Sequence, residues 1–202
     1  MKLAVEKLEA GYQGKTVVKD VSFTVEKGEF ISLIGPSGCG KSTVLKVLAG
    51  LLEPMAGTIM VDDAPLQGGS RHFSYMPQSD LLLDWYDILD NVCLYGKIHG
   101  KKKEAQQQAL ENLKEFGLAG YEHAYPSQLS GGMRQRAAFL RTALCDSDIL
   151  LLDEPFGALD VITREDMQDW LNRMRQRLDR TTLLVTHDID EAIYLSDRIL
   201  IL

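Results

Sequence analysis

The sequence has few cysteines and no long run of apolar residues, and these two shortages limit the kinds of protein it can encode. Its thiols are Cys39, Cys93 and Cys145. Because they are odd in number and lie far apart in the sequence, they fit neither a disulfide framework nor a zinc-ligand spacing. We interpret them as reduced thiols. The longest apolar runs, such as ILLL at 149–152, are far shorter than the roughly 20 residues that span a bilayer. Any membrane role would therefore depend on a partner.

Basic residues are also outnumbered by acidic ones. Lys and Arg number 22 against 29 Asp and Glu, a formal net charge of -7, which argues against nucleic acid or anionic lipid as the main partner. The N-terminus carries charges at Glu6, Lys7 and Glu9, so it lacks the uninterrupted apolar stretch of a signal peptide. The sequence therefore predicts a cytoplasmic, globular chain.

The pattern along the chain predicts an α/β protein. Alternating apolar and polar residues at 2–12 and 16–29 indicate half-buried antiparallel strands, whereas 29–35 is a continuous apolar strand followed by a helical pattern at 41–52. Two further short strands are expected at 57–63 and 72–78, joined by a turn at Gly68 and Gly69. Buried strands expected at 148–155 and 181–188 flank an amphipathic helix near 162–178, as parallel units require.

Helical patterns dominate from residue 88 to about residue 145. A stripe of Ala105, Ala109, Leu113 and Phe116 marks one helix of this stretch. We therefore expect one domain over 1–202, with the core and the antiparallel strands at about 1–86 and 146–202 and an inserted helical subdomain at about 87–145. The last residues begin a strand and then stop, which we interpret as a truncated C-terminal end.

The segment GPSGCGKST at 35–43 has the spacing G-x-x-x-x-G-K-[ST] of a phosphate-binding loop. Its glycines allow backbone N–H groups to converge on phosphate oxygens, Lys41 adds a positive charge, and Ser42 offers a hydroxyl to Mg²⁺. The loop follows a buried strand and opens a helix, which is the required context. A simple glycine-rich turn is the competing interpretation, and Cys39 within the loop is either a small filler or an oxidisable thiol.

Two acidic residues end the apolar strand ILLLDEP, where α/β sheets bind ligands. Asp153 suits a magnesium ligand and Glu154 suits a general base that polarises water. His187 ends the next buried strand, in a position to contact a γ-phosphate and hold the water in line. A solvated strand end and a structural histidine are the plainer alternatives, and His72, His99 and His123 have no comparable context.

The segment LSGGMRQR at 129–136 begins a second helix suited to an anion. No Asp or Glu occurs between residues 128 and 145, or between residues 30 and 52 around the phosphate loop. Arg134 and Arg136 occupy the first turn of the helix, where acidic residues normally complement the helix dipole. The sequence thus has two acid-free helix starts, although an ordinary glycine-rich start is the competing interpretation.

Together these motifs resemble the ATP-binding subunit of an ABC transporter, over nearly the whole chain. The resemblance implies a P-loop NTPase with a mostly parallel core sheet, an N-terminal antiparallel β-subdomain and an inserted helical subdomain. It implies ATP and Mg²⁺ as cofactors, with Lys41, Glu154 and His187 in catalysis. It also implies Ser42, Gln78 and Asp153 as metal ligands. The residues that it implies for ATP binding are Tyr12, Val17, Gly35, Pro36, Ser37, Gly38, Cys39, Gly40, Lys41, Ser42, Thr43 and Gln78.

The resemblance also answers why the chain has two anion-facing helix starts. In this family the signature segment of one subunit completes the nucleotide site of another, so two chains form a head-to-tail homodimer on binding ATP. The residues expected to act on the partner's nucleotide are Ser130, Gly131, Gly132, Gln135 and Asp160. The chain would then contain two half-sites.

A narrower resemblance is to bacterial importers of the nitrate, sulfonate and taurine group, which also includes importers of thiamine pyrimidine precursors. It rests on DEPFGALDVITRE and LLLDWYDILDNV, with Asp84 where members often carry proline. It implies integral membrane permease subunits as partners, an extracytoplasmic solute-binding protein as an indirect one, and a position on the inner face of the cell membrane. Trp85, Tyr86, Ile88 and Leu89 then contact the permease or form subdomain core.

Other classes of ATPase agree less well with the sequence. A soluble ABC-type ATPase of DNA repair needs long coiled-coil heptads, which are not present, and one of translation normally carries two cassettes. A P-loop kinase explains Lys41 but not LSGGMRQR, and a non-hydrolysing module does not account for Glu154 and His187. We therefore expect an ATPase that drives import, with a soluble ABC-type ATPase as the alternative. The transported solute is not encoded in this chain.

Overall fold

The structure is a computed structural model that describes residues 1–66 and 71–202. The expected turn at Gly68 and Gly69 lies outside the described residues. The described chain forms two compact units. The first comprises Met1–Tyr75, Ser147–Glu154 and Leu171–Leu202, and the second, which we call the helical unit, comprises Met76–Asp146 and Pro155–Trp170. We describe each unit by itself.

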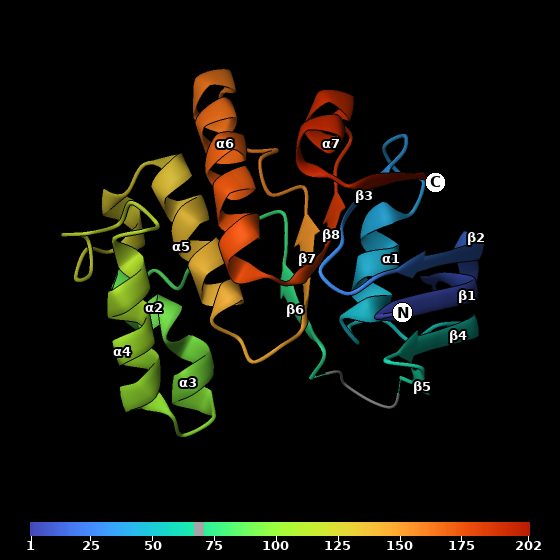
Figure 1. Ribbon diagram of the computed structural model, residues 1–202, viewed down its shortest axis with the longest axis horizontal. Coiled ribbons are helices and arrows are strands. Elements are labelled where there is room, and N and C mark those ends of the chain that lie inside the picture. The colour runs from blue at the N-terminus through green and yellow to red at the C-terminus, as the bar shows by residue number, and fades with distance from the viewer. Residues whose placement is uncertain (67–70) are drawn as a thin grey trace. The chain divides into compact units, whose positions relative to one another are not determined.

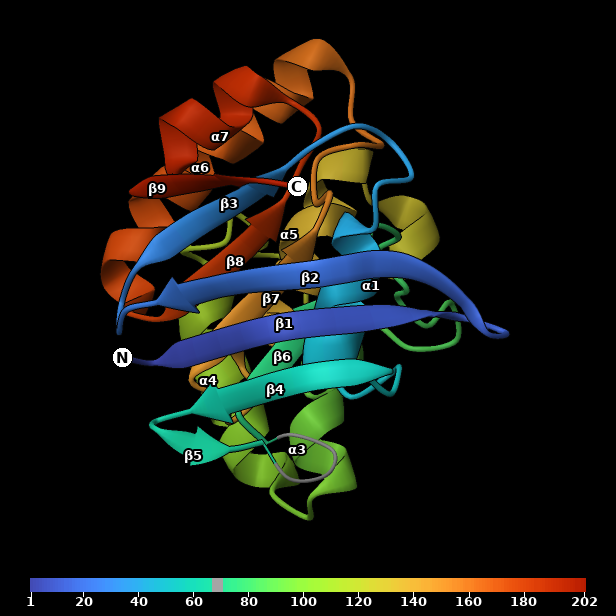
Figure 2. The same cartoon turned by 90° about the vertical axis from the view of Figure 1, so that its right-hand side faces the viewer.

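An antiparallel sheet begins the first unit, as the alternating N-terminal pattern predicts. Its strands are ordered β2-β1-β4-β5 and lie side by side in Figure 2. Their bounds are Leu3–Tyr12 for β1, Lys15–Val25 for β2, Ala56–Val61 for β4 and Ala64–Pro65 for β5. One face of β1 is buried, and Leu3, Val5, Leu8 and Ala10 belong to the core.

A second sheet carries the apolar strands, in the order β6-β7-β8-β3-β9. Their bounds are Phe30–Ile34 for β3, Phe73–Met76 for β6, Ile149–Asp153 for β7, Thr181–Val185 for β8 and Arg198–Ile201 for β9. Strand β3 pairs in parallel with β8 and β9, and β7 pairs in parallel with β8. Every residue of β7 and β8 is buried, which is typical of a parallel sheet covered on both faces.

Helix α1 (Lys41–Leu48) contacts β1, β2 and β7, and so joins the two sheets (Figure 1). Val44, Leu45 and Leu48 are fully buried on it, in one core with residues of both sheets. Helix α7 (Ile189–Leu195) contacts β3. The first unit therefore places α1 directly after β3, and the loop segment 35–43 runs from the end of β3 into the first turn of α1.

Five helical segments lie wholly in the helical unit. They are α2 (Ile88–Val92), α3 (Leu94–Ile98), α4 (Lys102–Leu113), a 3₁₀ turn (Pro126–Gln128) and α5 (Gly131–Ala143). The predicted stripe of α4 is confirmed, since Ala105, Ala109, Leu113 and the following Phe116 are all buried. Phe116 packs edge-on against Trp170 at a centroid distance of 4.9 Å. Among the described residues, no helix is both long and apolar enough to cross a bilayer.

The observed boundaries differ from those expected along the chain. The helical unit begins at Met76 rather than near residue 87, and it also takes in Pro155–Trp170, including the first half of α6 (Val161–Leu178). The reason is packing: Trp170 and Met167 on α6 are buried and contact Phe139 and Arg136 of α5. A strand that ends at residue 153 in one unit is thus followed at once by a segment that packs in the other.

Candidate nucleotide-binding and hydrolysis site

The loop 35–43 joins β3 to α1, and glycine is required within it. Gly40 is the N-cap of α1, with φ 108°, in the left-handed region that favours glycine. A Cβ there would lie 2.6 Å from Cγ2 of Val18, which is closer than carbon atoms pack. Because Gly40 has no side chain to accept a hydrogen bond, the first N–H groups of α1 are left for another acceptor, as an anion-binding helix start requires.

Lys41 supplies the positive charge of this loop from a buried position. Its side chain is 4% exposed, and Nζ donates to the carbonyl oxygens of Gly35 at 2.8 Å and Pro36 at 2.9 Å. Cys39 Sγ lies 3.9 Å from the same nitrogen. The ammonium group therefore lies inside the loop, where it draws the start and the end of the segment together.

Ser42 and Asp153, which the sequence places 111 positions apart, meet beside the loop. The Ser42 hydroxyl donates to Asp153 Oδ1 at 2.7 Å, and the Tyr75 hydroxyl donates to Oδ2 at 2.9 Å. Asp153 is 4% exposed. Burial, and then the neighbouring Asp153 charge, raise the pKa of Tyr75 well above its usual value. The hydroxyl and carboxylate oxygens form the kind of donor set that Mg²⁺ prefers.

Sequence reasoning did not identify Tyr75 as a site residue. It lies on β6, beside the strand that ends in Asp153. A polar tip on a half-buried strand was the available signal, since buried tyrosine hydroxyls usually find a partner.

Glu154 and His187 follow two neighbouring parallel strands and contact each other. Asp153 on β7 pairs with Val185 on β8, and the Glu154 N–H donates to the Val185 carbonyl at 2.9 Å. The Glu154 backbone has φ 45°, a left-handed conformation that costs a non-glycine residue about 1–3 kcal/mol. Its carboxylate Oε2 lies 3.3 Å from His187 Nδ1. The two predicted catalytic side chains are therefore brought together at the strand ends.

Tyr12 and Val17 lie at the β1–β2 hairpin, on the same side of the unit as the loop. Both are exposed, at 43% and 39%. A Cβ on Gly40 would be 3.4 Å from Val17 Cγ1, so Val17 lies against the loop. Lys46 Nζ on α1 lies 6.0 Å from the centroid of the Tyr12 ring. The structure therefore places an exposed aromatic ring and an exposed apolar residue close to α1.

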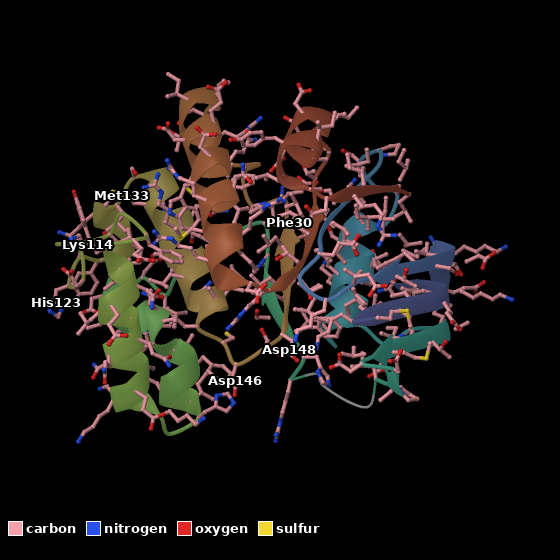
Figure 3. The ribbon with its side chains drawn as sticks, viewed as in Figure 1. Phe30, Lys114, His123, Met133, Asp146 and Asp148 are labelled. Atoms are coloured by element: carbon pink, nitrogen blue, oxygen red, sulfur yellow. The ribbon has the colours of Figure 1, made fainter. Side chains whose placement is uncertain are left out.

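The segment LSGGMRQR forms the start of α5 in the helical unit. Ser130 is the N-cap, and its Oγ accepts a hydrogen bond from the N–H of Met133 at 3.3 Å (Met133 is labelled in Figure 3). Gly132 is buried, and a Cβ added to it would lie 2.7 Å from Cγ2 of Thr163. Gly131 is less constrained, with Leu159 Cδ2 at 3.5 Å. The second glycine is therefore needed for close packing against the start of α6.

The polar side chains of α5 are used within the helical unit. Arg134 donates to Asp80 Oδ2 at 3.2 Å and to the Leu129 carbonyl at 3.0 Å. Arg136 lies over the Trp170 ring at 5.9 Å. Gln135, expected to act on a partner's nucleotide, is 5% exposed and donates to the Pro155 carbonyl. The structure thus gives Gln135 an internal bond that joins α5 to the segment after β7.

Asp160 precedes α6, and its carboxylate is bonded by Thr163. Its Oδ1 accepts from the Thr163 N–H at 3.1 Å, and its Oδ2 accepts from the Thr163 hydroxyl at 2.7 Å. These hydrogen bonds lower the pKa of the Asp160 carboxyl. Because the methyl group of Thr163 also contacts Gly132, one side chain joins Asp160 to the signature segment.

Gln78 is exposed and follows β6 within the helical unit.

The backbone of the loop after Gln78 is held by side chains of α2 and α5. Arg141 on α5 donates to the carbonyls of Asp80 and of Leu81, the second at 2.7 Å. Asn91 is fully buried on α2 and makes two hydrogen bonds to the backbone of Leu83. Its side-chain oxygen accepts from the Leu83 N–H at 2.7 Å, and its side-chain nitrogen donates to the Leu83 carbonyl at 3.0 Å.

Of the two interpretations proposed for residues 85–89, the structure bears on the one that makes them subdomain core. Ile88 is fully buried and Leu89 is 8% exposed, so both are core of the helical unit. Trp85 is 71% exposed and is available to a partner. Asp84 is exposed as well.

A phosphate-binding loop between a parallel strand and a helix, with two acidic residues and a histidine at the next strand ends, defines a P-loop ATPase. Comparison with known proteins gives the family: residues 18–157 match the family described as ABC transporter. The chain belongs to that family. The fold and the family are therefore those that the sequence indicates.

Individual relatives give the same result. The chain is 50% identical to the aliphatic sulfonates import ATP-binding protein SsuB 1 of Rhodococcus jostii (strain RHA1), over 95% of this chain and 75% of that protein. It is 44% identical to the taurine import ATP-binding protein TauB of Yersinia pestis, over 99% and 79%. A solved dimeric structure of the ATP-binding cassette MJ0796 bound to ADP and Pi matches with a TM-score of 0.82 at 30% identity, over 99% and 94%.

Proposed function

We propose that the chain binds and hydrolyses ATP to power solute import through a membrane permease. The observation that carries the proposal is the convergence of Ser42, Asp153, Glu154 and His187 beside the phosphate loop, at the ends of neighbouring strands. The relatives named for sulfonate and taurine import support the transport role. They do not favour the alternative of a soluble ATPase in DNA repair or translation.

The loop and its surroundings bind the nucleotide. The N–H groups at the start of α1 donate hydrogen bonds to the phosphate oxygens, and Lys41 exchanges its bonds to Gly35 and Pro36 for bonds to phosphate oxygens. The remaining loop residues, Ser37, Gly38, Cys39 and Thr43, line the phosphates. Tyr12 stacks on the adenine with Val17 beside the ring, since both are exposed next to α1.

The oxygen atoms of Ser42 and Asp153 fit Mg²⁺, and we assign Gln78 as a further ligand in the nucleotide-bound state. Bound there, the ion supplies positive charge that offsets the charge developing on the phosphates. Ser42 and Asp153 already lie 2.7 Å apart, so the pair needs little rearrangement. Tyr75 holds the second oxygen of Asp153 and thereby orients the carboxylate.

Hydrolysis then depends on a positioned water molecule. Glu154 accepts a hydrogen bond from the water and polarises it for attack on the γ-phosphate. His187, 3.3 Å from Glu154, keeps the carboxylate and the γ-phosphate in line. Lys41 stabilises the negative charge that develops on the transferred group. The left-handed backbone of Glu154 aims this carboxylate out of the strand.

The second half-site is the exposed N-terminal end of α5. Ser130 is exposed and caps a helix with no acidic residue in its first turn, so it suits the γ-phosphate held by a second chain. Gly131, Gly132 and Asp160 act with it, whereas Gln135 positions the helix from inside. Two chains thus close head-to-tail over two ATP molecules.

The permease binds the helical unit at the loop that carries Trp85. A tryptophan that is 71% exposed is a typical anchor of a protein interface. The assembly lies at the cytoplasmic face of the membrane, and an extracytoplasmic protein delivers the solute. The test is co-purification. Recovery with a hydrophobic membrane subunit encoded nearby would support this assignment, and stable binding to DNA or ribosomes instead would refute it.

Glu154→Gln tests the hydrolytic site. The variant keeps the shape of the side chain but not the base, so ATP affinity is retained and steady-state turnover falls by about 100-fold or more. Glu104→Gln, an exposed change on α4, is the matched control and leaves turnover unchanged. Unimpaired hydrolysis by Glu154→Gln would refute the assignment.

Ser130→Arg tests the second half-site in the Glu154→Gln background. The bulky cation blocks the exposed helix start and leaves the residues of the phosphate loop unchanged, so a single chain still binds ATP but no longer dimerises. Light scattering with and without ATP measures both variants. Dimers that persist with Ser130→Arg would reduce this segment to an ordinary helix start.

A further inference from the structure

Glu191 is a buried carboxyl group to which the proposed reaction assigns no role. Four charged side chains are buried among the described residues: Lys2, Lys41, Asp153 and Glu191. Lys41 and Asp153 belong to the nucleotide site, and Lys2 pairs with Asp62 and with Asp148, which is labelled in Figure 3. Glu191 lies on α7 and is 5% exposed. Burying a carboxyl group costs free energy, so we asked what Glu191 holds in place.

Glu191 takes part in a ring of hydrogen bonds with the residues on either side of His187. The Thr186 hydroxyl, on a residue that is 2% exposed, donates to Glu191 Oε2. The same hydroxyl oxygen accepts from the Asp188 N–H at 3.0 Å. Asp188 Oδ1 in turn accepts from the Glu191 N–H at 3.1 Å. The ring closes around the turn that leaves β8.

The turn is also fixed to the parallel sheet. The Thr186 N–H donates to the carbonyl of Leu33 on β3 at 3.3 Å. Thr186 is thus held by its backbone on the strand that leads into the phosphate loop and by its hydroxyl on α7. The backbone position of the next residue, His187, is therefore fixed.

His187 itself has little packing to fix it. Its side chain is 55% exposed, and its Nδ1 lies 3.3 Å from Oε2 of Glu154. An imidazole held so loosely by its surroundings takes its direction from the backbone that carries it. A displacement of about 1 Å at a catalytic group can lower a rate by about 100-fold. The geometry of the turn therefore decides whether His187 reaches Glu154.

We propose that Glu191 and Thr186 are positioning residues for His187, fixing the turn that directs its imidazole toward Glu154 and the γ-phosphate. The proposal rests on the proposed function and deepens it. Both side chains are buried, at 2% and 5% exposed, so both act through His187. A purely structural role, in which the ring only caps α7, would lower thermal stability and leave catalysis unchanged.

The test compares two substitutions of Thr186 with a matched control. Thr186→Val removes the hydroxyl but keeps the shape, so we expect kcat to fall about 10-fold or more, with KM for ATP within twofold of wild type. Thr186→Ser keeps the hydroxyl and restores kcat to within twofold. The control is Thr142→Val, which removes another buried hydroxyl, bonded to the Ala138 carbonyl of α5, and leaves kcat unchanged.

A double substitution separates positioning from stability. If Thr186 acts through His187, then adding Thr186→Val to His187→Ala leaves the residual single-turnover rate unchanged. A further fall would overturn the proposal, as would an equal loss of kcat in Thr142→Val. Glu191→Gln, which keeps an oxygen acceptor for Thr186, should retain most of the turnover. If Thr186→Val fails to fold, Thr186→Ala and Glu191→Ala are measured in its place, and both are expected to lose kcat at constant KM.

The outcomes also distinguish the two levels of the argument. A wild-type chain that hydrolyses no ATP refutes the proposed function, and the inference with it. Hydrolysis that is abolished by His187→Ala but unaffected by Thr186→Val refutes the inference alone.

Discussion

Replacing Gly132 with alanine tests whether the start of α5 is set by close packing. The added Cβ would lie 2.7 Å from Cγ2 of Thr163, about 1 Å inside an ordinary carbon contact. Thr163 cannot simply rotate, because its hydroxyl is bonded to Asp160 at 2.7 Å. Overpacking of this kind costs about 1–3 kcal/mol. Alanine also restricts the unfolded chain more than glycine does, which stabilises the helix by less than about 1 kcal/mol and offsets part of that cost. We therefore expect a net destabilisation of about 1–2 kcal/mol.

Thermal unfolding followed by circular dichroism measures this loss. For a chain of this size each kcal/mol shifts the melting temperature by about 2–4 °C, so Gly132→Ala should lower it by about 2–8 °C. Gly131→Ala is the matched control, since its Cβ meets Leu159 at an ordinary 3.5 Å, and it should melt within about 2 °C of wild type. Adding Thr163→Ser removes the clashing methyl group and should recover most of the loss. Equal melting temperatures for the two alanine variants would refute the packing argument.

Two further predictions concern the first unit. Lys41→Ala should weaken ATP binding about 10-fold or more in calorimetry, because the loop has no other full positive charge, and normal affinity would contradict the role of Lys41. Tyr75→Phe should change how stability depends on pH in the alkaline range. Because the pKa of Tyr75 is raised in the folded chain, the neutral hydroxyl adds to the free energy of unfolding below the usual tyrosine pKa of about 10, and this addition is lost as the pH rises above that value. Melting temperatures between pH 8 and 11 should therefore fall more steeply for wild type than for Tyr75→Phe, and parallel curves would argue against it.

The periodic and spaced features of the sequence predicted most of the fold. The alternating N-terminal strands, the fully buried strands before Asp153 and His187, and the α4 stripe ending at Phe116 all appear as expected. Each follows from a local rule, either alternation, continuous apolarity or helical spacing. The phosphate loop was equally clear because its function demands fixed residue types at fixed positions.

What sequence reasoning could not supply were contacts between distant segments. Nothing local indicates that Tyr75 bonds Asp153, that Thr163 excludes a side chain at Gly132, or that Gln135 turns inward. The arginines of α5 were attributed to an anion, yet Arg134 pairs with Asp80. Helix α7 was not predicted, since its seven residues lie between two strand-like patterns.

The way in which the loop after Gln78 is held affects how its outward side chains can change between related subunits. Arg141 and Asn91 hold it through the backbone atoms of Asp80, Leu81 and Leu83, and backbone atoms are the same whatever residue occupies a position. The outward side chains, Trp85 among them, are therefore free to be replaced while the path of the chain is kept. Subunits with one ATP-hydrolysing framework can in this way acquire surfaces for different membrane partners.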